Sequence, residues 1–277
     1  MTSSLAGSRI VTTAVNVPGP VAAATLRGMG AAVVKVEPPT GDPLEKFAAA
    51  WYADLSAGMD IVRLDLKTDQ GRGRIDELLA HADVLITSSR PASLQRLGLS
   101  WPELHRRHPQ LCQVAIIGYA APRHDVAGHD LTYQAEAGLV KPPAMPTALV
   151  ADLAGAQRVV IAVLDLLFSR LRTGGPGFEE VSLADCADLF ATPLRHGLTA
   201  GTGILGGHYA AYNIYPARDG WVAVAALEPH LRAALADELG VDVEDGTALA
   251  AALSQRPAAD WHTWAGVRGL PLSAVRT

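Results

Sequence analysis

Short apolar runs alternate with helix patterns along the first 120 residues, and this alternation limits the folds that the chain can adopt. A strand, a helix and a second strand within about thirty residues predict a parallel βαβ unit with a right-handed crossover. Helix patterns lie between the strands, for example at 21–31 and 71–82. The repeated unit predicts an α/β fold with a Rossmann-like, doubly wound, mostly parallel sheet and helices on both faces. The expected strands are 9–15, 32–37, 60–66, 83–89 and 111–120.

The pattern changes in the second half of the chain. Residues 151–175 form the clearest helix pattern, with Gly174 and Gly175 as its stop signal, and a strand and a helix are expected within 178–194. We expect a large domain over 1–200, a glycine-rich hinge at 201–207 and a smaller α+β domain over 208–277. The elements expected in the smaller domain are a hairpin at 212–227 that turns at 218–220, helices at 229–240, 247–255 and 258–266, and a strand near 270–275.

Composition narrows the class of protein further. Hydrophobic residues make up 49% of the chain and charged residues 18%, which is typical of a folded protein. The net charge of −5 gives no general electrostatic attraction to nucleic acid or to an anionic membrane, and we expect neither partner. We see no signal peptide and no apolar run of the ~20 residues that a membrane span requires. Cys112 and Cys186 have no metal-ligand spacing, so we expect reduced thiols, no metal and a cytoplasmic protein.

The first strand-to-helix turn argues against a dinucleotide-binding site. Its sequence, NVPGPVA at residues 16–22, lacks the GxGxxG pattern of dinucleotide-binding folds, so binding of NAD loses its main support. The start of a helix at that place can still receive a phosphate or a carbonyl group. A local basic patch is available for an anionic ligand, although each of these residues taken singly is best explained as solvated surface charge: Lys35, Arg63, Lys67, Arg90 and Arg96.

Three positions carry acid/base side chains at expected helix starts. His129 and Asp130 are adjacent, and an aspartate there is sufficiently explained as a helix cap, whereas the histidine titrates near neutral pH and can exchange a proton. Asp152 is also sufficiently explained as a helix cap. Its alternative role is that of a carboxylate at a helix start, where the backbone N–H groups of Gly155 and Ala156 could face a developing oxyanion. Glu228 precedes a proline at a helix start. Each position alone favours a structural role, and only their combination favours catalysis.

The residues above lie in sequence blocks that follow one another in a characteristic order. They include LAGSRIVTTAVNVPGP, GAAVVKVEPPTGDP, VRLDLKTDQGR, ADVLITSSRPASLQRLGLSW, GHDLTYQAEAGL, ADLAGA, SRLRTGGPG and YAAYNIYPARDGWVAVAALEP. In this order they resemble the class III CoA-transferase superfamily, the CaiB/BaiF group that includes the α-methylacyl-CoA racemases. The chain is shorter at its C-terminus than members of the group usually are, which leaves little or none of the segment that returns to the large domain.

The resemblance implies roles for individual residues. Asp152 in ADLAGA lies where the transferases have an aspartate that becomes acylated and then carries CoA. In the racemases a histidine of a GHD block exchanges the α-proton of a thioester with that aspartate, and His129 matches it. Asp130 and Glu228 match the residues that support the two bases. The glycine-rich GGGGQ loop of formyl-CoA-type transferases is not reproduced by GTGILGGH at 201–208.

Three functional hypotheses remain open at this point. The first is an acyl-CoA racemase or epimerase that exchanges the α-proton of a 2-methylacyl-CoA by two-base catalysis. The second is a CoA-transferase with Asp152 as nucleophile, and the third is a non-catalytic paralogue that binds CoA thioesters. No permanently bound cofactor is expected, because CoA enters as part of the substrate. The resemblance further implies a homodimer, for which an intertwined form is preferred, and CoA contacts at Lys35, Arg90, Pro91 and Gly155.

Overall fold

A computed structural model of the chain describes residues 3–276. The chain divides into two compact units between Phe190 and Ala191. Each unit has a hydrophobic core of its own. Within the described residues, no helix is both long enough and apolar enough to cross a lipid bilayer.

The first unit is built on a six-stranded sheet in which every neighbouring pair of strands is parallel. The strand order is β3-β2-β1-β4-β5-β6, so the chain moves outward from β1 to one edge and then restarts at β4 on the other side. That reversal between β1 and β4 is the point of a doubly wound sheet where ligands bind, at the carboxyl ends of the strands. The strands are β1 (Arg9–Thr12), β2 (Ala32–Glu37), β3 (Asp60–Arg63), β4 (Val84–Thr87), β5 (Cys112–Ile117) and β6 (Phe178–Ser182).

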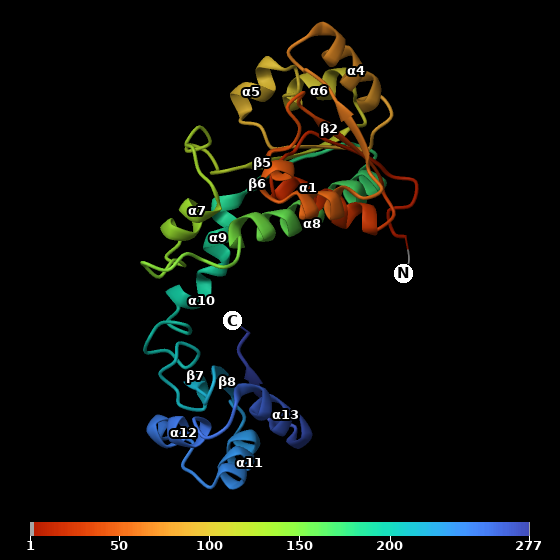
Figure 1. The fold of residues 1–277 in the computed structure, drawn as a ribbon. Helices are drawn as coiled ribbons and strands as arrows, with labels where there is room; N and C mark the ends of the chain where they lie inside the picture. Colours follow the sequence, from red (N-terminus) through yellow and green to blue (C-terminus); the bar gives the residue numbers. More distant parts are fainter. Residues whose placement is uncertain (1–2, 277) are drawn as a thin grey trace. The chain divides into compact units, whose positions relative to one another are not determined.

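Helices cover both faces of this sheet (Figure 1). Alternate strand residues face opposite sides, so Ile10 packs on one face with α1 and α8, whereas Val11 packs on the other face with α4, α5 and α6. The helices of the unit are α1 (Pro18–Gly28), α2 (Pro43–Phe47), α3 (Ala49–Ser56), α4 (Asp69–Leu79), α5 (Pro91–Arg96), α6 (Trp101–Arg107), α7 (Asp130–Glu136), α8 (Val150–Thr173) and α9 (Leu183–Phe190).

The ends of these helices follow from local sequence. The Asp42 side chain accepts the Leu44 N–H at the start of α2, and the Thr68 hydroxyl accepts the Gly71 N–H at the start of α4. Helix α8 ends at Gly174, whose φ of 76° lies in the left-handed region that glycine adopts without strain.

The second unit is a small α+β structure. Its antiparallel sheet has the order β7-β8-β9, and helices pack on the sheet through a core that includes Val222, Leu249 and Trp261. The indole N–H of Trp261 donates to the Leu253 carbonyl at 2.7 Å, which satisfies its polar atom inside the core. The elements are α10 (Thr192–Arg195), β7 (Tyr212–Pro216), β8 (Trp221–Ala225), α11 (Pro229–Leu239), α12 (Gly246–Leu253), α13 (Ala258–Arg268) and β9 (Leu272–Ala274).

The predicted fold class is confirmed: the sheet is doubly wound and parallel, and a smaller α+β unit follows it. The observed strands are mostly shorter than the apolar runs, because the pairing ends where the chain turns away at the carboxyl end of the sheet. The division of the chain falls at 190/191, and the glycine-rich 201–207 belongs to the second unit in this division. Its role as a hinge stays a prediction.

Candidate active site

A cavity of about 200 Å³ opens at the carboxyl ends of β1, β4 and β5, at the reversal of the strand order. Each of these strands contributes the loop that follows it, and Tyr133 of α7, Asp152 of α8 and Leu183 of α9 line the remaining sides. The cavity contains both polar and apolar groups. Its lining residues are Val15, Asn16, Pro18, Ser88, Arg90, Ile116, Ile117, Gly118, His124, Val126, Ala127, Gly128, His129, Tyr133, Asp152 and Leu183.

Asp130 joins the two helices that meet at the cavity. Its carboxylate accepts the backbone N–H of Asp152 at 3.0 Å, in the first turn of α8, where that N–H has no partner within the helix. The Gln134 amide donates both to the second carboxylate oxygen of Asp130 and to the Ala148 carbonyl, the latter at 2.8 Å. Asp130 and Gln134 are buried. Asp130 therefore satisfies the start of α8, although the sequence suggested a cap of its own helix, whose N-cap is His129.

Asp152 is the titratable group that this arrangement perturbs most clearly. Burial raises the pKa of its carboxyl from 3.8 to about 7, and the negative charge of Asp130 adds to the effect. A carboxyl with such a pKa exists in both protonation states near neutral pH, so it can both accept and donate a proton there. Asp152 and His129 line the same cavity. The cavity thus contains both residues that the resemblance to racemases predicts to exchange a proton with the substrate.

Other residues expected at the site have varied positions. Arg90 is exposed and lines the cavity, and Pro91 follows it as the first residue of α5. Gly155 is buried where α8 meets α9, and a Cβ added there would lie 2.3 Å from a Leu183 methyl carbon. Glu228 is exposed in the second unit, at the N-cap of α11. The roles of these residues in binding or catalysis stay predictions.

Two expectations differ from the geometry. Helix α8 begins at Val150, so the N–H groups of Gly155 and Ala156 lie beyond its first turn and belong to the hydrogen bonds within the helix. They do not face an oxyanion. Lys35 has no exposed surface, and its ammonium binds the carboxylates of Glu37 and Asp42. A direct contact between Lys35 and CoA therefore stays a prediction that the folded geometry does not favour.

Sequence reasoning missed three residues of the site. Tyr133 lines the cavity, and its ring occupies the space that side chains at Gly118 and Gly128 would fill. Burial raises the pKa of the Tyr133 hydroxyl to about 12, so it remains a proton donor throughout the physiological range. Gln134 orients Asp130, and Asn16 lines the cavity from the turn after β1. The one available signal was the i, i+4 spacing of Asp130 and Gln134 on a helix face.

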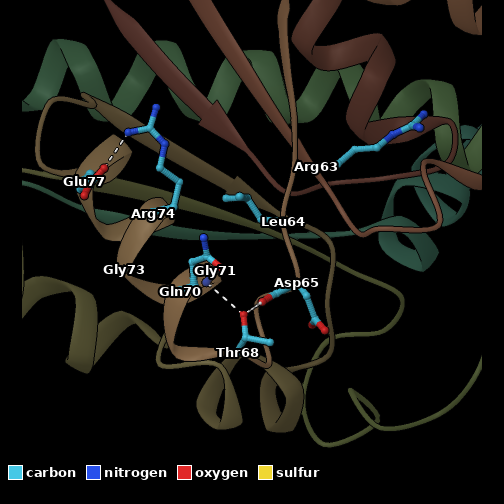
Figure 2. A pocket seen from close by; sticks show the side chains of 9 residues that line it. All are labelled: Arg63, Leu64, Asp65, Thr68, Gln70, Gly71, Gly73, Arg74 and Glu77. Carbon is cyan, nitrogen blue, oxygen red and sulfur yellow. Dashed lines mark hydrogen bonds and ion pairs between the residues drawn. The ribbon is translucent and has the colours of Figure 1, made fainter.

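A larger hollow of about 710 Å³ lies beside β3 and the start of α4, separate from the residues above (Figure 2). Its charged side chains are engaged with partners: Arg74 pairs with Glu77, and Arg63 pairs with Glu45 at 3.2 Å. The Thr68 hydroxyl donates to the Asp65 carbonyl and accepts the Gly71 N–H (Figure 2). These contacts stabilise the turn into α4 and bring no catalytic group into the hollow.

The fold and the cavity together define a doubly wound α/β protein with a cavity at the switch point of its sheet, lined by Asp152 and His129 among others. Residues 5–277 match the family model for CoA-transferase family III. The chain belongs to this family, which confirms the resemblance found in the sequence.

The relatives of this chain include both CoA-transferases and a racemase. Succinyl-CoA–D-citramalate CoA-transferase of Chloroflexus aurantiacus is 28% identical over 246 residues, which cover 80% of this chain and 61% of that protein. The α-methylacyl-CoA racemase of Mus musculus is 30% identical over 275 residues, which cover 93% of this chain and 68% of that protein. The crystal structure of a CAIB/BAIF family protein from Brucella suis superposes with a TM-score of 0.84 at 25% identity, covering all of this chain and 85% of that one. The chain thus spans about three-fifths of the citramalate relative's length.

Proposed function

We propose that the protein is an acyl-CoA racemase or epimerase that exchanges the α-proton of a 2-methylacyl-CoA thioester. The observation that carries the proposal is the Asp152 carboxyl, with a pKa of about 7, in one cavity with His129. Inversion of a carbon needs a base on one face and an acid on the other, both close to the α-carbon. His129 and Asp152 fill these two roles, and Asp130 orients the helix start that carries Asp152.

The thioester end of the substrate occupies the cavity in this proposal. A volume of about 200 Å³ accommodates a small acyl group and its thioester but not the whole of CoA, so the nucleotide portion lies outside. Arg90 is exposed at the cavity and supplies a positive charge for a CoA phosphate. Substrate enters as an acyl-CoA thioester, and no other cofactor takes part.

Proton exchange in D2O tests this function. The protein is incubated with a 2-methylacyl-CoA, and the α-proton signal is followed by NMR. We expect the signal to disappear with wild-type protein and to persist with His129→Ala. Exchange by the wild type at no more than the rate of the His129→Ala variant would rule the proposal out.

A second candidate is a CoA-transferase with Asp152 as nucleophile. Transferases at 28% identity favour it, and Asp152 is open to the cavity. In this mechanism the Asp152 carboxylate attacks the thioester carbonyl, and CoA leaves as a thiolate. The thiolate then attacks the aspartyl carbonyl of the mixed anhydride, which forms an enzyme–CoA thioester and releases the donor acid as a carboxylate. An intermediate that hydroxylamine traps would favour the transferase, provided that trapping requires Asp152 and persists without His129. Ping-pong kinetics toward a carboxylate acceptor should accompany it. CoA binding without exchange or transfer would indicate a non-catalytic paralogue.

We also propose that the protein forms a homodimer. The resemblance motivates this assembly, and α8 carries an exposed apolar stripe of Leu153, Ile161, Phe168 and Leu171 that a second copy would bury. Sedimentation analysis of the wild type and of Phe168→Glu measures the state directly. A monomeric wild type at micromolar concentration would contradict the proposal.

A further inference from the structure

A cluster of ionic side chains lies fully buried beneath the turn that follows β1. Lys35 and Glu37 come from the end of β2, Asp42 caps α2, and Tyr52 comes from α3. The Lys35 ammonium lies 2.5 Å from a Glu37 carboxylate oxygen and 2.7 Å from one of Asp42. The Tyr52 hydroxyl donates to Glu37 at 2.5 Å. The charged members of this cluster, Lys35, Glu37 and Asp42, each have 0% exposed surface.

The cluster contacts the cavity wall through one hydrogen bond. Asp42 accepts the backbone N–H of Asn16 at 2.9 Å with the carboxylate oxygen that does not face Lys35. From the other side, the Ser88 hydroxyl accepts the Val15 N–H at 3.2 Å. Val15 and Asn16 both line the cavity that contains Asp152. The turn is therefore held from two sides by side chains that are distant in the sequence.

The backbone of Asn16 needs such a restraint. Its φ of 65° lies in the left-handed region, and no other non-glycine residue among 3–276 has a positive φ. A non-glycine residue there costs on the order of 1 kcal/mol, and the conformation persists only where the surroundings enforce it. Asparagine tolerates this region better than most side chains, but tolerance alone does not select it.

Stability is a weak reason to keep three charges buried. Burying an ion pair costs several kcal/mol of hydration, and well-packed apolar side chains of similar volume often replace such pairs without loss of stability. The cluster requires another explanation. One Asp42 carboxylate oxygen accepts two backbone N–H groups, and the Lys35 ammonium holds the other oxygen and so fixes the carboxylate in place.

We propose that Lys35 and Asp42 are positioning residues, which hold the turn at 13–17 in the shape that completes the wall of the Asp152 cavity. Lys35 acts on Asp42, and Asp42 acts on the N–H of Asn16. A turn that relaxed to negative φ would move the Asn16 peptide group within the cavity wall. The thioester would then lie displaced from Asp152 and His129, while the groups that bind the rest of CoA stay in place. Only the rate measurement that tests this assignment rests on the proposed function.

Two matched variants separate this role from general stability. In Asp42→Asn we expect the amide oxygen to face the buried Lys35 ammonium, because an NH2 there would meet another donor. The NH2 then faces the backbone donors, and the bond from the Asn16 N–H is lost. Tyr52→Phe removes one hydrogen bond from the same cluster and leaves the contact with the turn intact. We expect the proton-exchange kcat to fall on the order of 10- to 100-fold in Asp42→Asn, with KM for the thioester within about threefold, and to stay within about twofold in Tyr52→Phe.

Hydrogen exchange of the Asn16 amide supplies a readout that does not need turnover. In the wild type we expect this amide to be protected like those of β1, although it lies in a turn, and in folded Asp42→Asn we expect it to exchange at least tenfold faster. Unprotected Asn16 in the wild type, an unchanged kcat in Asp42→Asn, equal losses in both variants, or a rise in KM alone would each overturn the assignment. A wild type without exchange or transfer activity refutes the proposed function instead, and the amide measurement still decides the role of Asp42.

Discussion

At the scale of single residues, the chemistry of the site depends on how Asp130 and Asp152 share one small volume. The Asp130 carboxylate binds the backbone of residue 152 and not its side chain. The Asp152 side chain is therefore left with burial and the nearby negative charge, and both raise its pKa. An aspartate that would ordinarily be ionised at neutral pH becomes a group that exchanges protons there.

This arrangement predicts a stability change with a defined sign. The unfolded Asp152 carboxyl ionises near 3.8 and the folded one near 7, so the wild type loses stability as pH rises through this interval. Asp152→Asn lacks this loss and keeps the bond from the residue-152 N–H to Asp130. We compare the free energy of unfolding of Asp152→Asn with that of the wild type at each pH. We expect this difference to be more favourable to the variant at pH 8 than at pH 3.5, by up to about 4 kcal/mol. A tenfold change in proton affinity corresponds to about 1.4 kcal/mol. Urea titrations at both pH values measure it, and a difference that does not depend on pH would contradict it.

The proposed function predicts that Asp130 affects the pH dependence of turnover. The basic form of Asp152 is populated above its pKa, so the rate constant for proton abstraction by this group should rise with pH through about 7. Asp130→Asn removes the repelling charge, lowers the pKa of Asp152 and moves this rise to lower pH. Asp125→Asn is the control, because Asp125 is 72% exposed on the loop before α7. A profile that moves equally in both variants would show that Asp130 has no specific effect.

At the scale of elements, the crossing of α8 and α9 sets the position of the helix that carries Asp152. Gly155 permits this approach, since a Cβ there would lie 2.3 Å from a Leu183 methyl carbon. Gly73 in α4 has no atom within 4 Å of the same position and is exposed. Both are glycines inside helices, but only Gly155 has a tertiary reason to be glycine.

Alanine substitutions at these two glycines should have opposite effects. Gly73→Ala should stabilise the protein by about 0.5–1 kcal/mol through helix propensity. Gly155→Ala should destabilise it by about 1–3 kcal/mol through overpacking, and the same substitution should cost less in a Leu183→Ala background than in the wild type. Urea unfolding measures all of these variants. A Gly155→Ala variant more stable than the wild type would show that α8 and α9 separate at no cost.

At the scale of the whole molecule, the two units are separate in their hydrophobic cores. The core of the second unit contains Tyr215, Val224, Leu235, Leu253 and Leu272, and its members come from β7, β8, β9 and the helices beside them. His129, Asp130 and Asp152 all lie in the first unit. The fold of the second unit can therefore be tested by itself.

A fragment of residues 191–277 should fold by itself. We expect a cooperative thermal transition by circular dichroism and dispersed amide signals by NMR, because the fragment keeps the core of the second unit intact. Leu249→Ala, at a position with no exposed surface, should lower the stability of the fragment by about 2–5 kcal/mol. A fragment without a cooperative transition would show that the second unit depends on the first.

The sequence by itself determined the order of elements, because strand and helix periodicity, caps and glycine stops are local properties. It placed β2 at residues 32–37 and α8 within 151–175, and its motifs identified the family. Strand ends and the division of the chain were less predictable, since they depend on where pairing and core contacts stop.

Tertiary structure alone decided what each charged residue does. Lys35 could be a surface cation or a buried one, and only packing made it the centre of an internal cluster. Asp130 was predicted to cap its own helix, yet it binds the start of α8, 22 residues later in the sequence. Burial, charge proximity and hydrogen bonds between distant segments are properties of the folded chain, and these properties bring the pKa of Asp152 to about 7.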